Sequence, residues 1–378
     1  MTSRMIVLVT TSFPITGDGS EAAGAFVADL AEELATHLHV RVVAPGENTL
    51  VEAWSDNLEI FRYAAPKRPL STLKMWRPSD FIWMMRVLSG GRSATRNAIK
   101  GADHIMALWA LPCGDWARHA GRRQGTPYSV WTLGSDIWTL GKIPVLRSYL
   151  RIILRGASRC WSDGMKLSKD TQAIAGRPVD FLPSTRRIEQ KRAQPRRTQA
   201  PYRLLFLGRW HQNKGIDLLL QSLDLLSEED WGRIEKVTIA GGGPLEATVR
   251  IEAKKLRDAG HPVEILGYLP REQSQESMCA SDFLLIPSRI ESIPLVFSDA
   301  IKLGLPVIAM PTGDLIDLVM PEIGILSKQI DSAAFAIAIR DAIAIENKSY
   351  ALEGLAEKFK LDSIAESIIS ATFVKADD

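Results

Sequence analysis

Two basic residues, Arg209 and Lys214, lie five positions apart where a short apolar run gives way to a helical pattern. The apolar run ends at Gly208, and Gly215 comes just before the helix. An arginine can place two N–H groups on neighbouring oxygens, a lysine acts as a compact charge, and free amides at a helix start attract anions. This pattern predicts a diphosphate-binding site. Two solvated loop cations are the alternative.

A carboxylate follows a later apolar run. Glu291 comes after the break at Pro287-Ser288, and a helix is expected to begin at about Ile293. We expect Ser292 to cap this helix and the free amides near Leu295 and Val296 to point at the bound ligand. A carboxylate beside a basic diphosphate pocket has no obvious structural role, so Glu291 is a candidate functional residue.

Three further residues are site candidates. Asp299, eight residues after Glu291, can accept hydrogen bonds from vicinal hydroxyls, or it is simply favoured by the helix dipole. Gly24 opens a helix after a glycine-bearing loop, an arrangement that aims amides at an anion. Asp136 ends the polar cluster Gly134-Ser135-Asp136, which follows a strand-like run. Such loops also occur simply to make a turn.

Several motifs are absent from the sequence. It contains no Asp-x-Asp, no His-x-x-x-His and no Cys/His cluster, so we expect no metal and no cofactor. It contains no Gly-x-x-x-x-Gly-Lys-Ser/Thr, which disfavours a P-loop. No motif supports nucleic-acid binding.

The candidate residues follow short apolar runs that alternate with helical patterns. Strands of this length separated by helices predict βαβ units and parallel sheets buried on both faces, an α/β fold, with ligands outside the carboxyl ends of the strands. The expected strands are 5–10, 40–44, 104–108, 128–133, 159–162 and 179–182, then 203–208, 237–240, 263–266, 283–286 and 306–309.

A segment rich in Arg, Gln and Pro divides the chain. Residues 184–201 contain hardly an apolar residue, which predicts a basic linker. We expect one Rossmann-like lobe over 1–183, a second over 202–350, and C-terminal helices over 351–378. Within and after the second lobe, helices are expected at 332–345, 350–360 and 363–373.

Composition describes an ordinary globular protein. Of 378 residues, 46% are hydrophobic and 24% charged. The three cysteines are far apart, which favours a reducing compartment over a disulfide framework. With no signal-peptide pattern and no long apolar stretch, we expect a cytoplasmic protein, or one at the inner face of the cytoplasmic membrane.

The net charge of +2 hides an asymmetry. Residues 1–200 carry 28 Lys and Arg against 17 Asp and Glu, whereas residues 201–378 carry 18 against 27. Residues 67–100 are basic and include Trp76, Trp83 and a dense apolar run. An interfacial helix on an anionic membrane has this composition, and so does a core helix with a solvated rim. For the asymmetry as a whole, attraction between the lobes is the alternative.

Together, these motifs resemble the donor lobe of the retaining glycosyltransferases of family 4, which have the GT-B fold with two lobes facing a cleft. The matching stretches are Gly208-Arg209 with Lys214-Gly215, Ala240 to Pro244, Leu266-Gly267-Tyr268, Pro287-Ser288 with Glu291 and Asp299-Ala300, and Gly304 to Val307. The first lobe matches more loosely, through Ser12-Phe13-Pro14, Gly24 to Val27 and Gly134-Ser135-Asp136.

The resemblance implies a role for each candidate residue. It implies that the first lobe binds the acceptor and the second the nucleotide sugar, and that the last helix crosses back to the first lobe. The implied roles are diphosphate binding by Arg209, Lys214, Gly24, Leu295 and Val296, catalysis by Glu291 and Asp136, ribose binding by Asp299, and base binding by Tyr268. The chain departs from the family pattern at Asp299, where the family has Glu, and at Leu133, where many members have His.

The expected reaction is metal-independent transfer of a hexose, with retention, from a nucleotide-diphosphate sugar to a glycan or lipid-linked acceptor in surface polysaccharide or glycolipid biosynthesis. The cations and helix amides would stabilise the departing diphosphate. A GT-B epimerase or phosphorylase is a rival enzyme. A non-catalytic nucleotide-sugar-binding member of a glycan-assembly complex is the rival from another class.

Overall fold

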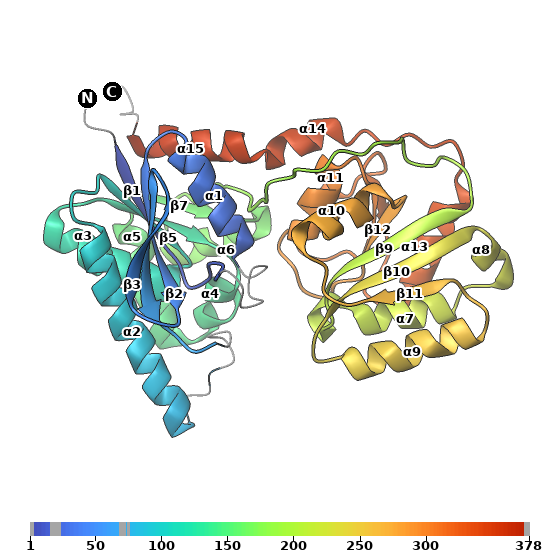
Figure 1. Ribbon diagram of the computed structural model, residues 1–378, viewed down its shortest axis with the longest axis horizontal. Coiled ribbons are helices and arrows are strands. Elements are labelled where there is room, and N and C mark those ends of the chain that lie inside the picture. Colours follow the sequence, from blue (N-terminus) through green and yellow to red (C-terminus); the bar gives the residue numbers. More distant parts are fainter. Residues whose placement is uncertain (1–3, 16–23, 68–72, 74–75, 374–378) are drawn as a thin grey trace. The chain divides into compact units, whose positions relative to one another are not determined.

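The computed structural model describes residues 4–15, 24–67, 73 and 76–373. The chain forms two compact units, one of Met1–Pro183 with Leu361–Asp378 and one of Ser184–Lys360. Each unit is built on one mostly parallel β-sheet with helices on both faces (Figure 1). The predicted α/β class is confirmed.

The first unit contains an eight-stranded sheet in the order β3-β4-β2-β1-β5-β6-β7-β8. Its strands are β1 (Met5–Val9), β2 (His39–Gly46), β3 (Leu50–Ser55), β4 (Leu58–Ala64), β5 (His104–Leu108), β6 (Tyr128–Thr132), β7 (Arg159–Ser162) and β8 (Asp180–Phe181). Along β1, Val7 and Val9 belong to one buried cluster, and Ile6 and Leu8 belong to another on the opposite face. Both faces are therefore covered, as the unbroken apolar run predicts.

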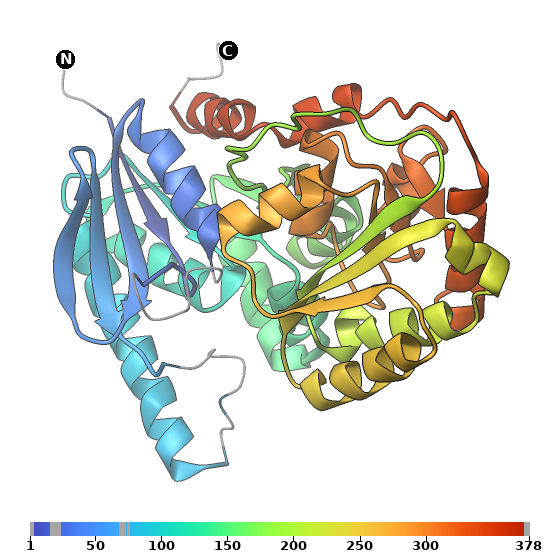
Figure 2. The same cartoon turned by 45° about the vertical axis from the view of Figure 1, so that its right-hand side comes forward.

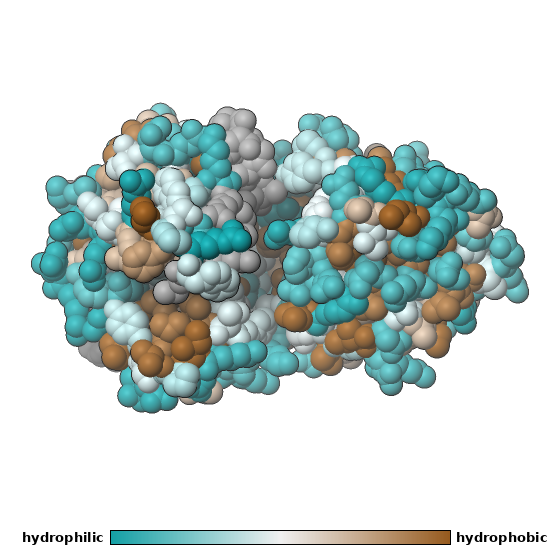
Figure 3. All heavy atoms as spheres, turned by 90° about the horizontal axis from the view of Figure 1, so that it is seen from below, coloured by the Kyte–Doolittle hydropathy of each residue, from teal (hydrophilic) through white to brown (hydrophobic). Residues whose placement is uncertain are grey.

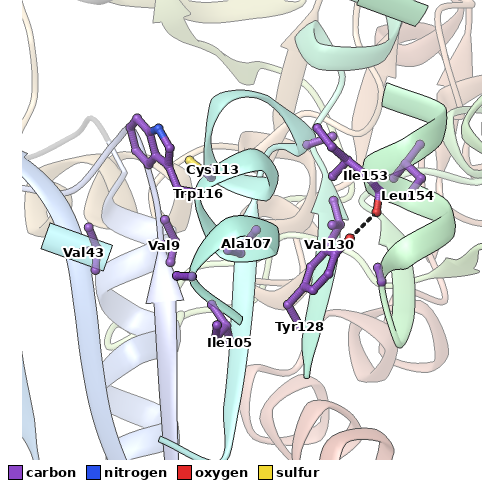
Figure 4. Close-up of a cluster of buried hydrophobic side chains, with 14 of the residues drawn as sticks. Val9, Val43, Ile105, Ala107, Cys113, Trp116, Tyr128, Val130, Ile153 and Leu154 are labelled. Atoms are coloured by element: carbon purple, nitrogen blue, oxygen red, sulfur yellow. Dashed lines mark hydrogen bonds between the residues drawn. The ribbon is translucent and has the colours of Figure 1, made fainter. Parts of the chain in front are cut away.

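Helices from distant parts of the sequence cover this sheet. They are α1 (Ala25–Ala35), α2 (Pro78–Ala98), α3 (Asp115–Gln124), α4 (Ser135–Trp138), α5 (Pro144–Gly156), α6 (Met165–Ala175) and α15 (Leu361–Phe373). Figure 4 shows the cluster between the central strands and α3 and α5, where the Tyr128 hydroxyl donates to the Ile153 carbonyl over 2.6 Å. On the other face, Leu30 of α1 and Ile368 of α15 share one cluster.

The β3–β4 pair was not predicted from the sequence. The two strands form the antiparallel edge of the sheet, and β3 is largely exposed. An exposed edge strand needs no continuous apolar run, so periodicity gives little signal there.

The second unit contains a fully parallel six-stranded sheet in the order β11-β10-β9-β12-β13-β14. Its strands are β9 (Tyr202–Arg209), β10 (Ile234–Gly242), β11 (Val263–Leu266), β12 (Phe283–Ile286), β13 (Val307–Ala309) and β14 (Gly324–Leu326). All of the strands predicted in the second half are present; β14 was not predicted.

The helices of the second unit lie on both faces of its sheet (Figure 2). They are α7 (Ile216–Asp224), α8 (Glu228–Gly232), α9 (Glu246–Asp258), α10 (Arg271–Cys279), α11 (Leu295–Lys302), α12 (Leu315–Leu318), α13 (Ser332–Ala344) and α14 (Glu353–Ala356). The helix expected at 350–360 is instead two short pieces, α14 and a 3₁₀ turn at Glu357–Phe359, because only Leu352 and Phe359 of this segment are buried.

The basic segment 184–201 lies along the second unit without regular secondary structure. Arg192 donates to the carbonyls of Met278, Ser281 and Leu303, and Thr185 donates to the Phe359 carbonyl over 2.7 Å. Arginines therefore help to hold this segment to the unit, where the sequence predicted only a basic linker.

Candidate functional site

The predicted donor residues occupy loops at the carboxyl edge of the second sheet. Strands β9, β10, β12 and β13 run parallel to one another, so the loops that follow them meet at one edge. The Trp210 amide after β9 donates to the Gly242 carbonyl at the end of β10 over 2.8 Å. The Thr312 hydroxyl after β13 donates to the Arg289 carbonyl after β12 over 3.1 Å.

Two glycines let these loops approach. Gly215 has a φ of 68°, and a Cβ added there would lie 1.7 Å from the Pro287 carbonyl oxygen. Gly313 has a φ of 55°, and a Cβ there would lie 2.1 Å from the Glu291 carbonyl oxygen. A side chain at Gly215 would push the loop of Lys214 away from the loop of Glu291, and one at Gly313 would push the loop after β13 away from the loop of Glu291.

Lys214 and Glu291 form an ion pair across this contact. The Ser288 hydroxyl also reaches the Glu291 carboxylate, over 3.4 Å. The lysine side chain is more exposed than that of the glutamate, so its ammonium group is accessible to a ligand beside the carboxylate. An ammonium group has three donors and can hold a carboxylate and a phosphate oxygen at once.

Arg209 is the last residue of β9, and its side chain is exposed. The next residue, Trp210, is buried, so the chain alternates between solvent and core at this point. Within the described residues, the Arg209 side chain makes no ion pair and no hydrogen bond. It is therefore free to receive an anion.

Helix α11 begins two residues later than predicted. Pro294 is its N-cap, and the Phe297 amide makes the first hydrogen bond, to the Pro294 carbonyl over 2.9 Å. The amides of Leu295 and Val296 precede that bond, as expected for a helix start that binds an anion. Ser292 does not cap the helix, because proline already fixes the entry conformation, and its hydroxyl is buried without a hydrogen-bond partner.

Asp299 lies on α11 but is enclosed by protein groups. It is 2% exposed, forms an ion pair with Arg186 of the segment 184–201, and has Lys302 3.7 Å from its second oxygen. The carboxylate predicted to bind ribose thus serves an internal contact in this structure, and ribose binding stays a prediction.

Tyr268 lies just after β11, the edge strand of the sheet. Its side chain is 57% exposed, and the neighbouring Gly267 carbonyl accepts from the Gly241 amide over 3.0 Å. The tyrosine is therefore held near the glycine loop after β10 and is open to solvent. Base binding there stays a prediction.

Two predicted site residues belong to the first unit. Gly24 is the N-cap of α1 with a φ of 77°, and a Cβ there would lie 2.5 Å from the Ser12 carbonyl, so the helix start packs tightly on the loop after β1.

Asp136 is 1% exposed, and its carboxylate accepts from the amides of Ala110, over 2.7 Å, and Leu133, over 3.4 Å. Burial raises the pKa of Asp136 to about 6. In this structure the carboxylate ties two strand ends together and is closed to solvent.

Sequence reasoning missed Arg289 and Asp217. Arg289 binds both carboxylate oxygens of Asp217 over 2.7 Å each and also donates to the Gln212 carbonyl over 2.7 Å. Burial opposes ionisation of Asp217, but the hydrogen bonds and charge of Arg289 outweigh it and hold the pKa below its ordinary value. The pair joins the loop of Lys214 to the loop of Glu291. The only signal in the sequence was that Asp217 lies close to Lys214, that Arg289 lies close to Glu291, and that Asp217 and Arg289 have opposite charges.

No cluster of three or more His, Cys, Asp or Glu side chains that could hold a metal ion occurs within the described ranges.

Comparison with known proteins also finds similarity to glycosyltransferases. A family model described as "Glycosyl transferases group 1" matches residues 201–344. A protein of Bacillus subtilis provisionally named as the teichuronic acid biosynthesis glycosyltransferase TuaC is 26% identical over 252 residues, which are 63% of this chain and 60% of that protein. The chain thus matches less than two thirds of this relative's length.

Solved structures resemble the whole chain. Sucrose-phosphate synthase from Thermosynechococcus elongatus has a TM-score of 0.71 at 18% identity, with 97% of each chain covered. The Anabaena protein HepE in complex with UDP-glucose has a TM-score of 0.66 at 14% identity, with 97% of this chain and 98% of that chain covered. The chain therefore has the predicted GT-B fold, and its residues 201–344 are similar to the group 1 glycosyl transferases.

Proposed function

We propose that this protein is a retaining glycosyltransferase that moves a hexose from a nucleotide-diphosphate sugar to a glycan or lipid-linked acceptor in polysaccharide or glycolipid biosynthesis. The observation that carries the proposal is the Lys214–Glu291 ion pair at the carboxyl edge of the second sheet, where Glu291 comes four residues before Leu295, the first residue of α11. UDP-glucose is the donor to test first, because HepE was solved in complex with it.

The reaction builds negative charge on the diphosphate as the sugar leaves. Lys214, Arg209 and the amides of Leu295 and Val296 supply fixed positive charge and dipoles for that anion, so no bound metal is required. Glu291, next to the lysine, would contact the sugar. The acceptor hydroxyl attacks from the face of the leaving group, and its proton passes to the departing phosphate.

The first experiment measures release of nucleoside diphosphate from UDP-glucose and the other common UDP, GDP and ADP sugars. We expect Lys214→Ala and Glu291→Gln each to lower kcat/KM by about 10²-fold to 10³-fold, the loss typical of removing one charge-stabilising group. Lys254→Ala is the control, because that lysine lies on the exposed face of α9 and pairs with Asp258. EDTA should leave turnover unchanged. Equal rates for wild type and both site variants would refute the proposal.

A non-catalytic sugar-nucleotide-binding protein is the second candidate. The ion pair between Asp299 and Arg186 favours it, since that carboxylate is not presented to a ligand in this structure. Under this alternative, UDP-glucose or another nucleotide sugar raises the melting temperature while wild type releases no nucleoside diphosphate with any acceptor. Turnover that depends on Lys214 excludes it.

A further inference from the structure

One helix of the first unit exposes apolar side chains that none of the described residues of that unit covers. In α2, Val87, Ala94 and Ala98 are buried against the sheet. On the other side, Phe81 is 48%, Ile82 53% and Met85 51% exposed. A surface helix normally carries polar residues on its outward face. Here the outward face of the first two turns is apolar.

The N-terminal half of α2 extends beyond the sheet. Arg92 reaches the first residue of α3, Asp115, over 3.8 Å, and Pro78 begins α2 fourteen residues earlier, about 21 Å along a helix axis. Figures 1 and 2 both show this end of α2 projecting past the strands of its unit.

Helix α5 adds a second exposed apolar group on the same side of the sheet. Val145 is 77% exposed and Ile143 48% exposed, at the start of the helix. Asp115 at the start of α3 accepts from Tyr149 of α5, so α2, α3 and α5 are neighbours. We name the exposed residues of α2 and α5 and their flanking cations the α2–α5 surface.

The charge of this surface has one sign. Residues 77–100 and 142–155 contain nine Lys and Arg and a single carboxylate, Asp80, which is buried. Arg86 and Arg147 are exposed beside the apolar groups. Figure 3 shows hydrophobic side chains gathered among hydrophilic ones on the underside of the first unit, the side toward which α2 projects.

We propose that the α2–α5 surface docks on a lipid bilayer that contains anionic lipids. Apolar side chains flanked by basic ones suit insertion at the level of the headgroups, with the arginines on phosphates. A second copy of the chain is a poor occupant, because a symmetric contact would bring the two clusters of cations together. No helix among the described residues has the length and apolarity needed to cross a membrane, so the proposed contact is peripheral.

Docking extends the proposed function, because it would hold the first unit where a lipid-linked acceptor is found. The exposed apolar residues occupy the N-terminal ends of α2 and α5, and helices that follow parallel strands begin at the carboxyl edge of a sheet. Vesicle binding does not depend on turnover, so docking and catalysis can fail separately.

The test is co-sedimentation of the full chain with vesicles of phosphatidylcholine alone or with 30% phosphatidylglycerol. We expect partitioning onto the anionic vesicles to exceed that onto the neutral ones by about tenfold or more, and to weaken with salt. Replacing Phe81, Ile82 and Met85 with Ser should lower it about tenfold. Neutralising Arg86 and Arg147 with Gln should lower it about fivefold per residue.

The control is the pair Arg250→Gln and Ile251→Ser on α9 of the second unit, where an exposed isoleucine adjoins an exposed arginine. It should bind like wild type. The proposal is overturned if wild type does not prefer anionic vesicles or if the triple Ser variant binds as well as wild type. It is also overturned if the control loses as much binding, or if sedimentation equilibrium shows a dimer that the triple Ser variant abolishes.

Discussion

Two buried residues of the first unit respond to pH in opposite directions. Burial raises the pKa of Asp136 from 3.8 to about 6 and lowers that of His104 from 6.5 to about 4. The contribution of Asp136 to the free energy of unfolding is fully present below about pH 4 and is lost as the pH rises through 6. The contribution of His104 is fully present above about pH 6.5 and is lost as the pH falls through 4. Each effect amounts to about 3 kcal/mol. Between pH 4 and 6 the two largely cancel.

We predict that single variants separate these effects. From pH 4 to 6, Asp136→Asn should gain about 3 kcal/mol of unfolding free energy relative to wild type, and His104→Gln should lose about as much. Urea denaturation followed by tryptophan fluorescence measures this, because eight of the ten tryptophans lie in residues 1–200. If either difference from wild type stayed constant with pH, the burial argument for that residue would be wrong.

At the scale of single residues, the sequence predicted the charged groups but not all of their partners. The structure brings Lys214 and Glu291 together because both follow neighbouring parallel strands, which the sequence pattern already indicated. The partner of Asp299 is Arg186, which lies 113 positions away in a segment without periodicity. No local pattern predicts such a contact.

At the scale of loops and helices, the Arg289–Asp217 pair fixes the site. It joins the start of α7 to the loop before α11, so it sets the separation of the two loops that carry Lys214 and Glu291. A two-point contact between arginine and a carboxylate restricts orientation as well as distance. Since both side chains are partly exposed, the stability from the pair is modest, about 1 kcal/mol.

We predict that Arg289→Met raises the donor KM about tenfold while it changes stability little, because a small shift of positioning groups weakens binding strongly. Exchange of amide hydrogens in 210–216 and 288–294 should become faster. Arg250→Met, which breaks the exposed pair with Glu246 on α9, is the control. An unchanged KM and unchanged exchange would show that the loops hold their positions without the pair.

Buried elements were easier to predict than exposed ones. Strands such as β1 and β9 are covered on both faces and read as unbroken apolar runs, so their positions followed from the sequence. The edge strand β3 and the short helix α14 have no buried residues, and their form depends on neighbours distant in sequence. The cap of α11 was misplaced because Ser292 has the right chemistry for a cap, but Pro294 sets the backbone there.

At the scale of the whole molecule, the chain leaves the first unit at Pro183 and returns to it at Leu361. Helix α15 completes the core of the first unit, where Ile364 and Ile368 are buried in one cluster with α1. The pattern of 363–373 predicts a helix, but the surface that receives it depends on the tertiary fold. The stability of the first unit therefore depends on the far end of the sequence.

We predict that Ile364→Ala with Ile368→Ala destabilises the first unit by roughly 4 kcal/mol or more, because each truncation removes buried methyl groups and leaves a cavity. Tryptophan fluorescence in urea should show the loss, and amide exchange should accelerate in β1 and α1 while β9 and α7 keep their protection. Ile339 of α13 is buried in the second unit, so Ile339→Ala should accelerate amide exchange in β9 and α7 while β1 and α1 keep their protection. If truncating α15 accelerated exchange equally in both units, the two would unfold together, and the chain's return to its first unit would stabilise the whole molecule.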